Sequence, residues 1–390
     1  MWFPYSCAAI MRGVSHRRIV VKLGTSLLTS GGDHLDLSVM ATVVDQIVEL
    51  HSRGRQLIVV SSGAVAAGRE RLLRRGVVES RNTAFKQVLA SIGQSHLMNT
   101  YERLFARHDI TIAQALLTRD CLVDRAGYLN ARNTLLALCE MDVVCIVNEN
   151  DVVAVEELEE RQFGDNDSLS AMVANLVDAD LLVILTDTDG LYTADPRVHP
   201  DATLVPRVDH IDEGIVSLAG GTSSGQGIGG MVTKVEAARL ATCSGIDVVV
   251  ANGHEPDVLR RLDAGESVGT LFAASVSKLE SRKRWILSGL ASHGRVIVDG
   301  GAVRALRRGT GSLLPAGVTS VVGRFQRGDI VDIAAEDGVR VASGIVNYSS
   351  EDLERIKGQH SERIADVLEH AYGDEIVHRN NMVVLSGEDE

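Results

Sequence analysis

Short apolar runs alternate with longer helical patterns along most of this chain, and this alternation constrains the fold more than any other feature. The runs lie at residues 19–23, 56–60, 111–117, 143–147, 181–185 and 247–250, and helical patterns lie at 37–51, 83–107, 168–177 and 232–243. Uninterrupted Val, Ile and Leu are typical of strands buried on both faces, and strands that alternate with helices form parallel sheets. The sequence therefore predicts an α/β fold whose mostly parallel central sheet is sandwiched by helices.

After about residue 269 the pattern changes to glycine-punctuated apolar segments at 295–299, 320–325 and 329–333. A chain of 390 residues also exceeds the usual span of one hydrophobic core. We therefore expect two domains joined by a linker. The expected boundaries are a disordered N-terminal extension at 1–17, the α/β domain at 18–270, a charged linker at 271–284, a small β-rich domain at 285–380 and a tail at 381–390.

Composition and charge narrow the functional classes. The formal net charge of -13 disfavours a protein that wraps nucleic acid, because neutralising phosphates needs a surplus of Lys and Arg. Five cysteines form no CxxC pair, which is typical of reduced, buried thiols in a cytoplasmic protein. No apolar run approaches the roughly 18 residues of a membrane span. We expect a cytoplasmic protein with a small-molecule substrate.

Two strand ends have the composition of anion sites. Lys22 closes the first predicted strand just before Gly24, Thr25 and Ser26, where a tight turn can present N–H and hydroxyl groups to a phosphate. The same segment is equally compatible with a strand-end lysine that extends into water. The small residues at 61–68 follow the second strand and open a helix, whose N-terminus favours an anion, although Ser is also a common helix N-cap.

A glycine-rich segment at 225–234 resembles three motifs that it does not match. It contains GxGxxG but follows no buried strand, which excludes a dinucleotide-binding fingerprint. The chain has no VAIK-like, HRD or DFG segment and no GxxxxGK[ST], so neither a protein-kinase loop nor a Walker loop is present. What remains is a loop that runs into a helix and delivers Thr233 and Lys234 to a nucleotide polyphosphate.

Polar clusters stand where open α/β sheets bind ligands, at strand ends and helix starts. Residues 148–151 end a buried strand, and residues 164–168 precede a helix, where an Asp N-cap is the ordinary alternative. Residues 186–192 end another strand and suit a base and ribose, although by themselves they are also compatible with a β-turn. The histidines have no HExxH spacing, so a zinc site is not expected.

Taken together, these motifs closely resemble those of the glutamate 5-kinases, members of the amino-acid-kinase family that carry a C-terminal PUA domain. The likeness runs from about residue 18 to 380 and rests on the segments 21–26, 61–64, 147–151, 164–167, 185–197, 229–234, 282–286 and 309–315. The resemblance implies the amino-acid-kinase fold followed by a PUA domain. It also implies transfer of the ATP γ-phosphate to the side-chain carboxylate of L-glutamate, the first step of proline biosynthesis.

The resemblance further implies roles for particular residues. The nucleotide would meet Lys22, Thr186, Asp187, Ile228, Gly229, Gly230, Met231, Val232, Thr233 and Lys234. Glutamate would be held by Ser62, Asp151 and Asn166, with Asn148 as a weaker candidate. The family's loop usually has Thr where this chain has Ile228, so one hydroxyl contact to the nucleotide is missing, and we expect activity to survive because Lys234 is kept.

The expected chemistry requires positioning and charge neutralisation. A carboxylate with an ordinary pKa of about 4.3 is already ionised at neutral pH and needs no general base. Lys22 and Lys234 are the predicted catalytic residues, because they would neutralise charge as two anions meet. Asp165 or Asp167 would hold Mg²⁺ with the ATP, and Asp151 would bind the α-ammonium of glutamate.

The resemblance also implies partners. Proline is the expected feedback inhibitor, a homo-dimer or tetramer is the expected assembly, and glutamyl phosphate reductase is an expected transient partner. Two other activities stay open: a related carboxylate kinase acting on N-acetylglutamate or aspartate, and an RNA-binding regulator that uses the PUA domain. RNA binding is disfavoured by the acidic chain, although five arginines give the second domain local positive charge: Arg304, Arg307, Arg308, Arg324 and Arg327.

Overall fold

The computed structural model describes residues 16–73, 83–154, 166–220, 230–277, 294–308 and 311–385. The chain divides into two compact units. The first comprises Met1–Leu122 and Ala131–Lys278, and the second comprises Val123–Asn130 and Leu279–Glu390.

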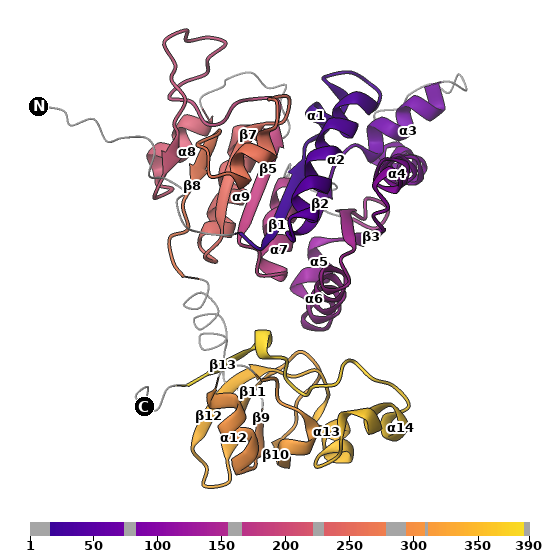
Figure 1. Ribbon diagram of the computed structural model, residues 1–390, viewed down its shortest axis with the longest axis vertical. Coiled ribbons are helices and arrows are strands. Elements are labelled where there is room, and N and C mark those ends of the chain that lie inside the picture. Colours follow the sequence, from indigo (N-terminus) through magenta and orange to yellow (C-terminus); the bar gives the residue numbers. More distant parts are fainter. Residues whose placement is uncertain are drawn as a thin grey trace, which may run out of the picture. The chain divides into compact units, whose positions relative to one another are not determined.

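Within the described residues, eight strands of the first unit form one sheet (Figure 1). Their order across the sheet is β3 (Ile112–Leu117), β4 (Val144–Glu149), β2 (Gln56–Ser61), β1 (Arg18–Leu23), β5 (Leu181–Thr186), β7 (Asp247–Asn252), β8 (Thr270–Phe272) and β6 (Arg207–Val208). Neighbouring strands from β3 to β7 are parallel, and β8 is antiparallel to β7. The expected α/β fold with a mostly parallel sheet is confirmed.

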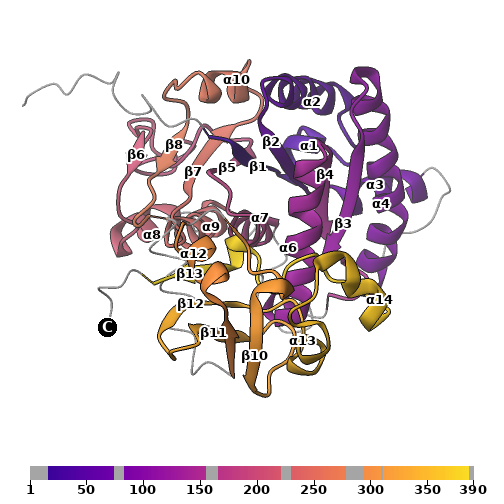
Figure 2. The same cartoon turned by 60° about the horizontal axis from the view of Figure 1, so that its bottom comes forward.

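Helices cover both faces of this sheet (Figure 2). One face carries α1 (Thr25–Thr29), α2 (Leu37–Ser52) and α10 (Val258–Asp263), whose apolar side chains share a buried cluster with those of the strands. The opposite face carries α7 (Asn166–Leu176) and α9 (Met231–Thr242), which pack against each other. The other described helices of at least five residues in this part of the chain are α3 (Ala64–Leu73), α4 (Thr83–Phe105), α5 (Arg119–Val123), α6 (Arg125–Glu140) and α8 (Glu213–Gly220).

The alternation of side chains along β1 decides where Lys22 points. Ile19, Val21 and Leu23 belong to the cluster under α2 and α10. Because successive side chains of a strand point to opposite faces, Lys22 points to the other face, where α7 packs on β1. The strand thus carries one lysine into the layer between the sheet and α7.

Two glycines let α3 and α4 approach closely. A Cβ on Gly93 would lie 1.7 Å from the carbonyl oxygen of Ala64, and a Cβ on Gly68 would lie 1.9 Å from that of Leu89. Any other residue would therefore force the two helices apart. Since α3 begins just after Ser62, this contact fixes α4 beside the end of β2.

The second unit contains a five-stranded sheet within the described residues, in the order β10 (Val318–Gly323), β9 (Gly294–Val298), β11 (Ile330–Ala335), β12 (Arg340–Ile345) and β13 (Met382–Val384). Short helices α12 (Gly300–Arg307), α13 (Ser350–Ile356) and α14 (Ile364–Leu368) accompany it, and Phe325 and Tyr348 lie in its core. The expected β-rich second domain is confirmed. No helix in the described part of the chain is long and apolar enough to cross a membrane.

Candidate functional site

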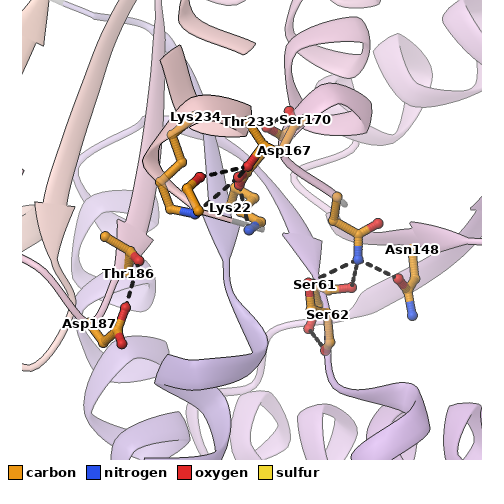
Figure 3. Close-up of polar contacts among 12 residues, drawn as sticks. Lys22, Ser61, Ser62, Asn148, Asp167, Ser170, Thr186, Asp187, Thr233 and Lys234 are labelled. Atoms are coloured by element: carbon orange, nitrogen blue, oxygen red, sulfur yellow. Dashed lines mark hydrogen bonds and ion pairs between the residues drawn. The ribbon is translucent and has the colours of Figure 1, made fainter. Parts of the chain in front are cut away.

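One buried carboxylate joins the two predicted lysines. Asp167 Oδ1 lies 2.5 Å from Lys22 Nζ, and its Oδ2 lies 3.0 Å from Lys234 Nζ (Figure 3). Asp167 is 0% exposed, Lys22 is 2% exposed and Lys234 is 6% exposed. Two ammonium groups and one carboxylate carry one positive charge together, which suits a place where an anionic phosphate is bound.

The helix starts of α7 and α9 build this cluster. Asp167 is in the first turn of α7, where the partial positive charge of the helix end stabilises a carboxylate. Lys234 is in the first turn of α9, which begins after Gly230 without a side-chain cap. Thr233 Oγ1 donates to Asp167 Oδ2 at 2.8 Å and so ties one helix start to the other. The start of α9 therefore presents backbone N–H groups beside Lys234, an arrangement that favours phosphate.

A second polar group lies beside the first, toward β2 and β4. Asn166 Nδ2 donates to Ser62 Oγ at 3.0 Å, to Asn148 Oδ1 at 3.0 Å and to the carbonyl oxygen of Ser61 at 3.2 Å. Figure 3 shows Ser61, Ser62 and Asn148 together on one side of Lys22 and Asp167. Because Asn166 and Asp167 are consecutive in α7, one helix turn contributes to both groups.

The hydroxyl of Ser61 forms a hydrogen bond with a residue of α4. Ser61 Oγ lies 2.7 Å from the hydroxyl oxygen of Tyr101, which is fully buried. Burial raises the pKa of Tyr101 far above its ordinary value, so the phenol stays neutral and serves as a fixed hydrogen-bond partner.

The end of β5 forms a third group, on the other side of the lysines. Thr186 Oγ1 donates to Asp187 Oδ1 at 3.0 Å (Figure 3). Asn252, at the end of β7, donates to Asp189 Oδ1 at 2.9 Å, and Tyr192 donates to Asp189 Oδ2 at 2.8 Å. These bonds order the turn after β5, where a nucleotide is expected.

The structure brings most of the sequence-predicted site residues to the same edge of the sheet. Asp151 follows β4 and is partly buried, and Gly230 through Lys234 form the start of α9. Asp165, Ile228 and Gly229 lie outside the described residues. Segment 24–26 is not the expected tight turn, because α1 begins at Thr25 directly after Gly24. The ligand roles assigned to these residues stay predictions.

Three residues that contact the candidate site were not expected from the sequence: Gln94, Tyr101 and Asn252. Gln94 and Tyr101 lie within the long helix α4, seven residues apart, where no local pattern marks a polar residue as functional. Asn252 is the last residue of the buried strand β7. A polar residue at a strand end is the signal that marked Asn148 and Thr186, so Asn252 could have been predicted in the same way.

The described residues do not form a cage for a metal ion. They contain no group of three or more His, Cys, Asp or Glu side chains that could hold one. Both oxygens of Asp167 face lysine ammonium groups, so this carboxylate does not fit a direct Mg²⁺ ligand. The metal role of Asp165 stays a prediction outside the described residues.

Comparison with known proteins is consistent with this geometry. The model of the amino acid kinase family matches residues 17–252, and that of the PUA domain matches residues 294–368. Glutamate 5-kinase of Dehalococcoides mccartyi (strain ATCC BAA-2266 / KCTC 15142 / 195) is 55% identical over 375 residues, which cover 96% of this chain and 100% of that protein. Glutamate 5-kinases of Herpetosiphon aurantiacus and Deinococcus radiodurans are 50% and 48% identical, over 95% and 94% of this chain and 99% and 100% of their own lengths.

Proposed function

Because the chain belongs to the amino acid kinase family, and within it to the glutamate 5-kinases, we propose that it transfers the γ-phosphate of ATP to the side-chain carboxylate of L-glutamate. The product is L-glutamyl 5-phosphate, and the reaction is the first step of proline biosynthesis. The observation that carries the proposal is the buried cluster in which Asp167 holds Lys22 and Lys234 together beside the polar group around Asn166.

In this mechanism an oxygen of the glutamate side-chain carboxylate attacks the γ-phosphorus. The bond from that phosphorus to the β,γ-bridging oxygen breaks, and ADP leaves with the electron pair. The carboxylate is already ionised at neutral pH, so no proton has to be removed. Lys22 and Lys234 reduce the repulsion between the two anions and stabilise the charge that develops on the transferred group.

Asp167 acts on the lysines rather than on the substrate. Its two oxygens contact the two ammonium groups, so their positions are fixed before ATP arrives. A preorganised pair of charges does not have to reorient during the reaction. Avoiding this reorganisation is the main source of electrostatic rate enhancement. Asp167 is therefore a positioning residue.

The order of the strands supports the placement of the two substrates. Ser62 and Asn148 lie at the ends of β2 and β4, on one side of β1, whereas Thr186 and Asp187 lie at the end of β5 on the other side. Glutamate accordingly occupies the side of β2 and β4, with Ser62, Asn148, Asp151 and Asn166 as its contacts, and ATP the side of β5 and α9, where Ile228 and Gly229 would complete the loop. The γ-phosphate then meets the carboxylate at the lysines.

Mg²⁺ would enter bound to the phosphates of ATP, where it lowers their charge. We further propose feedback inhibition by proline, assembly into a homo-dimer or tetramer, and transient contact with the reductase that consumes the unstable acyl phosphate. The expected location is the cytoplasm, where buried thiols such as those of Cys139 and Cys145 stay reduced.

The test compares acceptors directly. ATP-dependent hydroxamate formation is measured with L-glutamate, N-acetylglutamate and aspartate, each with and without added proline. We expect turnover of L-glutamate alone, and a lower rate when proline is present. Turnover of N-acetylglutamate or aspartate alone would overturn the assignment, whereas turnover of glutamate that proline leaves unchanged would contradict only the feedback proposal.

A further inference from the structure

The hydrogen bonds around Asn148 fix the direction of every amide in this part of the site. Asn148 Oδ1 accepts from the backbone N–H of Glu149 at 2.8 Å, and a backbone N–H can only donate. The other end of the Asn148 amide must then be its NH₂ group, which donates to Gln94 Oε1 at 2.8 Å. Since Oε1 of Gln94 is the acceptor here, its Nε2 is the free end of that side chain.

Two buried atoms of this network lack a partner. Gln94 Nε2 and Asn166 Oδ1 are both inaccessible to solvent, and neither has a hydrogen-bond partner among the residues that the structure describes. Nε2 can only donate, and Oδ1 can only accept. Buried polar atoms are rarely left unpaired, and a ligand that offers both an acceptor and a donor would satisfy these two.

An α-amino acid head group offers this combination. Its carboxylate accepts hydrogen bonds, and its ammonium donates them. Gln94 is also held firmly in place, because the neighbouring Gly93 sits against the carbonyl oxygen of Ala64 and Gln94 itself is bonded to Asn148. A donor fixed in this way loses little freedom when it binds a substrate.

We propose that Gln94 is a further substrate-binding residue, whose Nε2 donates to the α-carboxylate of the acceptor while Asn166 Oδ1 accepts from its α-ammonium. This inference rests on the proposed function. Asn148, which holds Gln94, is on β4, and β2 separates β4 from β1. Two strand spacings place β4 about 10 Å from the strand that carries Lys22. We therefore assign the α-carboxylate, and not the reactive carboxylate, to Gln94. The side-chain carboxylate must instead reach the lysines and the γ-phosphate.

The test uses Gln94→Glu and a second substrate, the α-amide of L-glutamate. Glu keeps an oxygen for Asn148 but turns a second oxygen toward the substrate, where Gln had a donor. The α-amide keeps the reactive side-chain carboxylate and offers an NH₂ donor in place of an α-carboxylate oxygen. We expect the KM of Gln94→Glu for L-glutamate to rise about 10- to 100-fold, with the KM for ATP unchanged.

The decisive quantity is the preference for L-glutamate over its α-amide, taken as the ratio of their kcat/KM values. The unchanged chain should prefer L-glutamate, and Gln94→Glu should reduce or reverse that preference by at least about tenfold. Gln87→Glu, the same change two turns earlier on α4, should leave the preference unaltered. If Gln94→Glu does not fold, Gln94→Met, which removes the donor at similar length, should reduce the preference in the same direction.

A preference that stays the same in the folded variants would overturn the inference, because Gln94 would then only support Asn148. That result is distinct from failure of the proposed function, in which the unchanged chain would form no product from L-glutamate at all.

Discussion

The burial of Lys22 in an ion pair supports its proposed role in catalysis, because a buried ion pair contributes little to stability by itself. Lys22 is 2% exposed and points into the layer under α7, where an apolar side chain would pack with less cost. Replacing it by Met keeps most of the volume and removes the charge, and Asp167 still keeps its contact with Lys234. We expect kcat to fall roughly 100- to 1000-fold, as when one charge-stabilising donor is removed, while the KM for L-glutamate changes little.

The measurement is steady-state kinetics together with a thermal melt of the variant. Lys86→Met, the same change at an exposed position of α4, is the control and should retain full activity. An unchanged kcat in a folded Lys22→Met variant would contradict the role of this lysine in the transition state.

Among single residues, strand ends can be located from local sequence signals, whereas contacts between distant segments cannot. Lys22, Ser62 and Asn148 stand at or next to strand ends, and this position singled them out. The sequence suggested Asp167 as an N-cap or metal ligand. Its pairing with Lys22 and Lys234 joins residues that are 145 and 67 positions away in sequence, which no local pattern encodes.

Among the helices, the contact between α3 and α4 connects packing to the proposed glutamate site. Gly93 has no space for a side chain, because its Cβ would lie 1.7 Å from the carbonyl oxygen of Ala64. We expect Gly93→Ala to separate the two helices, lower the free energy of unfolding by roughly 1–3 kcal/mol and raise the KM for L-glutamate more than that for ATP.

Denaturant melts and the two KM values check this expectation. Gly220→Ala, at the end of α8 with no described atom within 4 Å of the added Cβ, is the control and should stay within about 1 kcal/mol of the parent chain. Equal stability of Gly93→Ala and the parent chain would show that the helices do not pack as closely as described.

The burial of β4 and α6 predicts which thiols react. Cys145 and Cys139 are buried, whereas Cys121 and Cys243 are exposed, so the expectation that all cysteines are buried is wrong for the latter two. Burial raises the pKa of Cys145 to about 12 and also raises the pKa of Cys139. Since the thiolate is the nucleophile, both stay largely protonated and unreactive at pH 8.

Mass spectrometry of the native protein during treatment with iodoacetamide at pH 8 tests this difference. We expect early modification of Cys121 and Cys243, and modification of Cys139 and Cys145 only after unfolding. Equal rates at all four sites in the native protein would contradict the burial of β4.

The long elements were predictable because their apolar periodicity is strong. The predicted strand at 19–23 corresponds to β1 at Arg18–Leu23, and the predicted helix at 37–51 to α2 at Leu37–Ser52. The antiparallel edge was not predicted, because β8 and β6 have only three and two residues and carry no periodic signal. Their place in the sheet is decided by pairing between distant segments.

At the scale of the whole molecule, the net charge of -13 opposes the alternative function of RNA binding. The second unit does contain arginines, and Arg327 lies 3.8 Å from the ring centre of Tyr372, so part of this positive charge is engaged with an aromatic ring. We expect no gel shift of structured RNA at 150 mM salt with up to about 10 μM protein. A shifted band whose affinity falls as salt rises would instead support RNA recognition.

In the proposed reaction, a carboxylate oxygen of L-glutamate becomes bonded to the γ-phosphorus of ATP. L-glutamate labelled with ¹⁸O in its side-chain carboxylate, unlabelled ATP and hydroxylamine test it directly. Hydroxylamine attacks the acyl carbon of the product, the bond from that carbon to the bridging oxygen breaks, and the phosphate leaves with that oxygen. We expect one ¹⁸O atom in each phosphate released. Phosphate without label would show that the γ-phosphate goes to water or another acceptor, and would rule out transfer to the glutamate carboxylate.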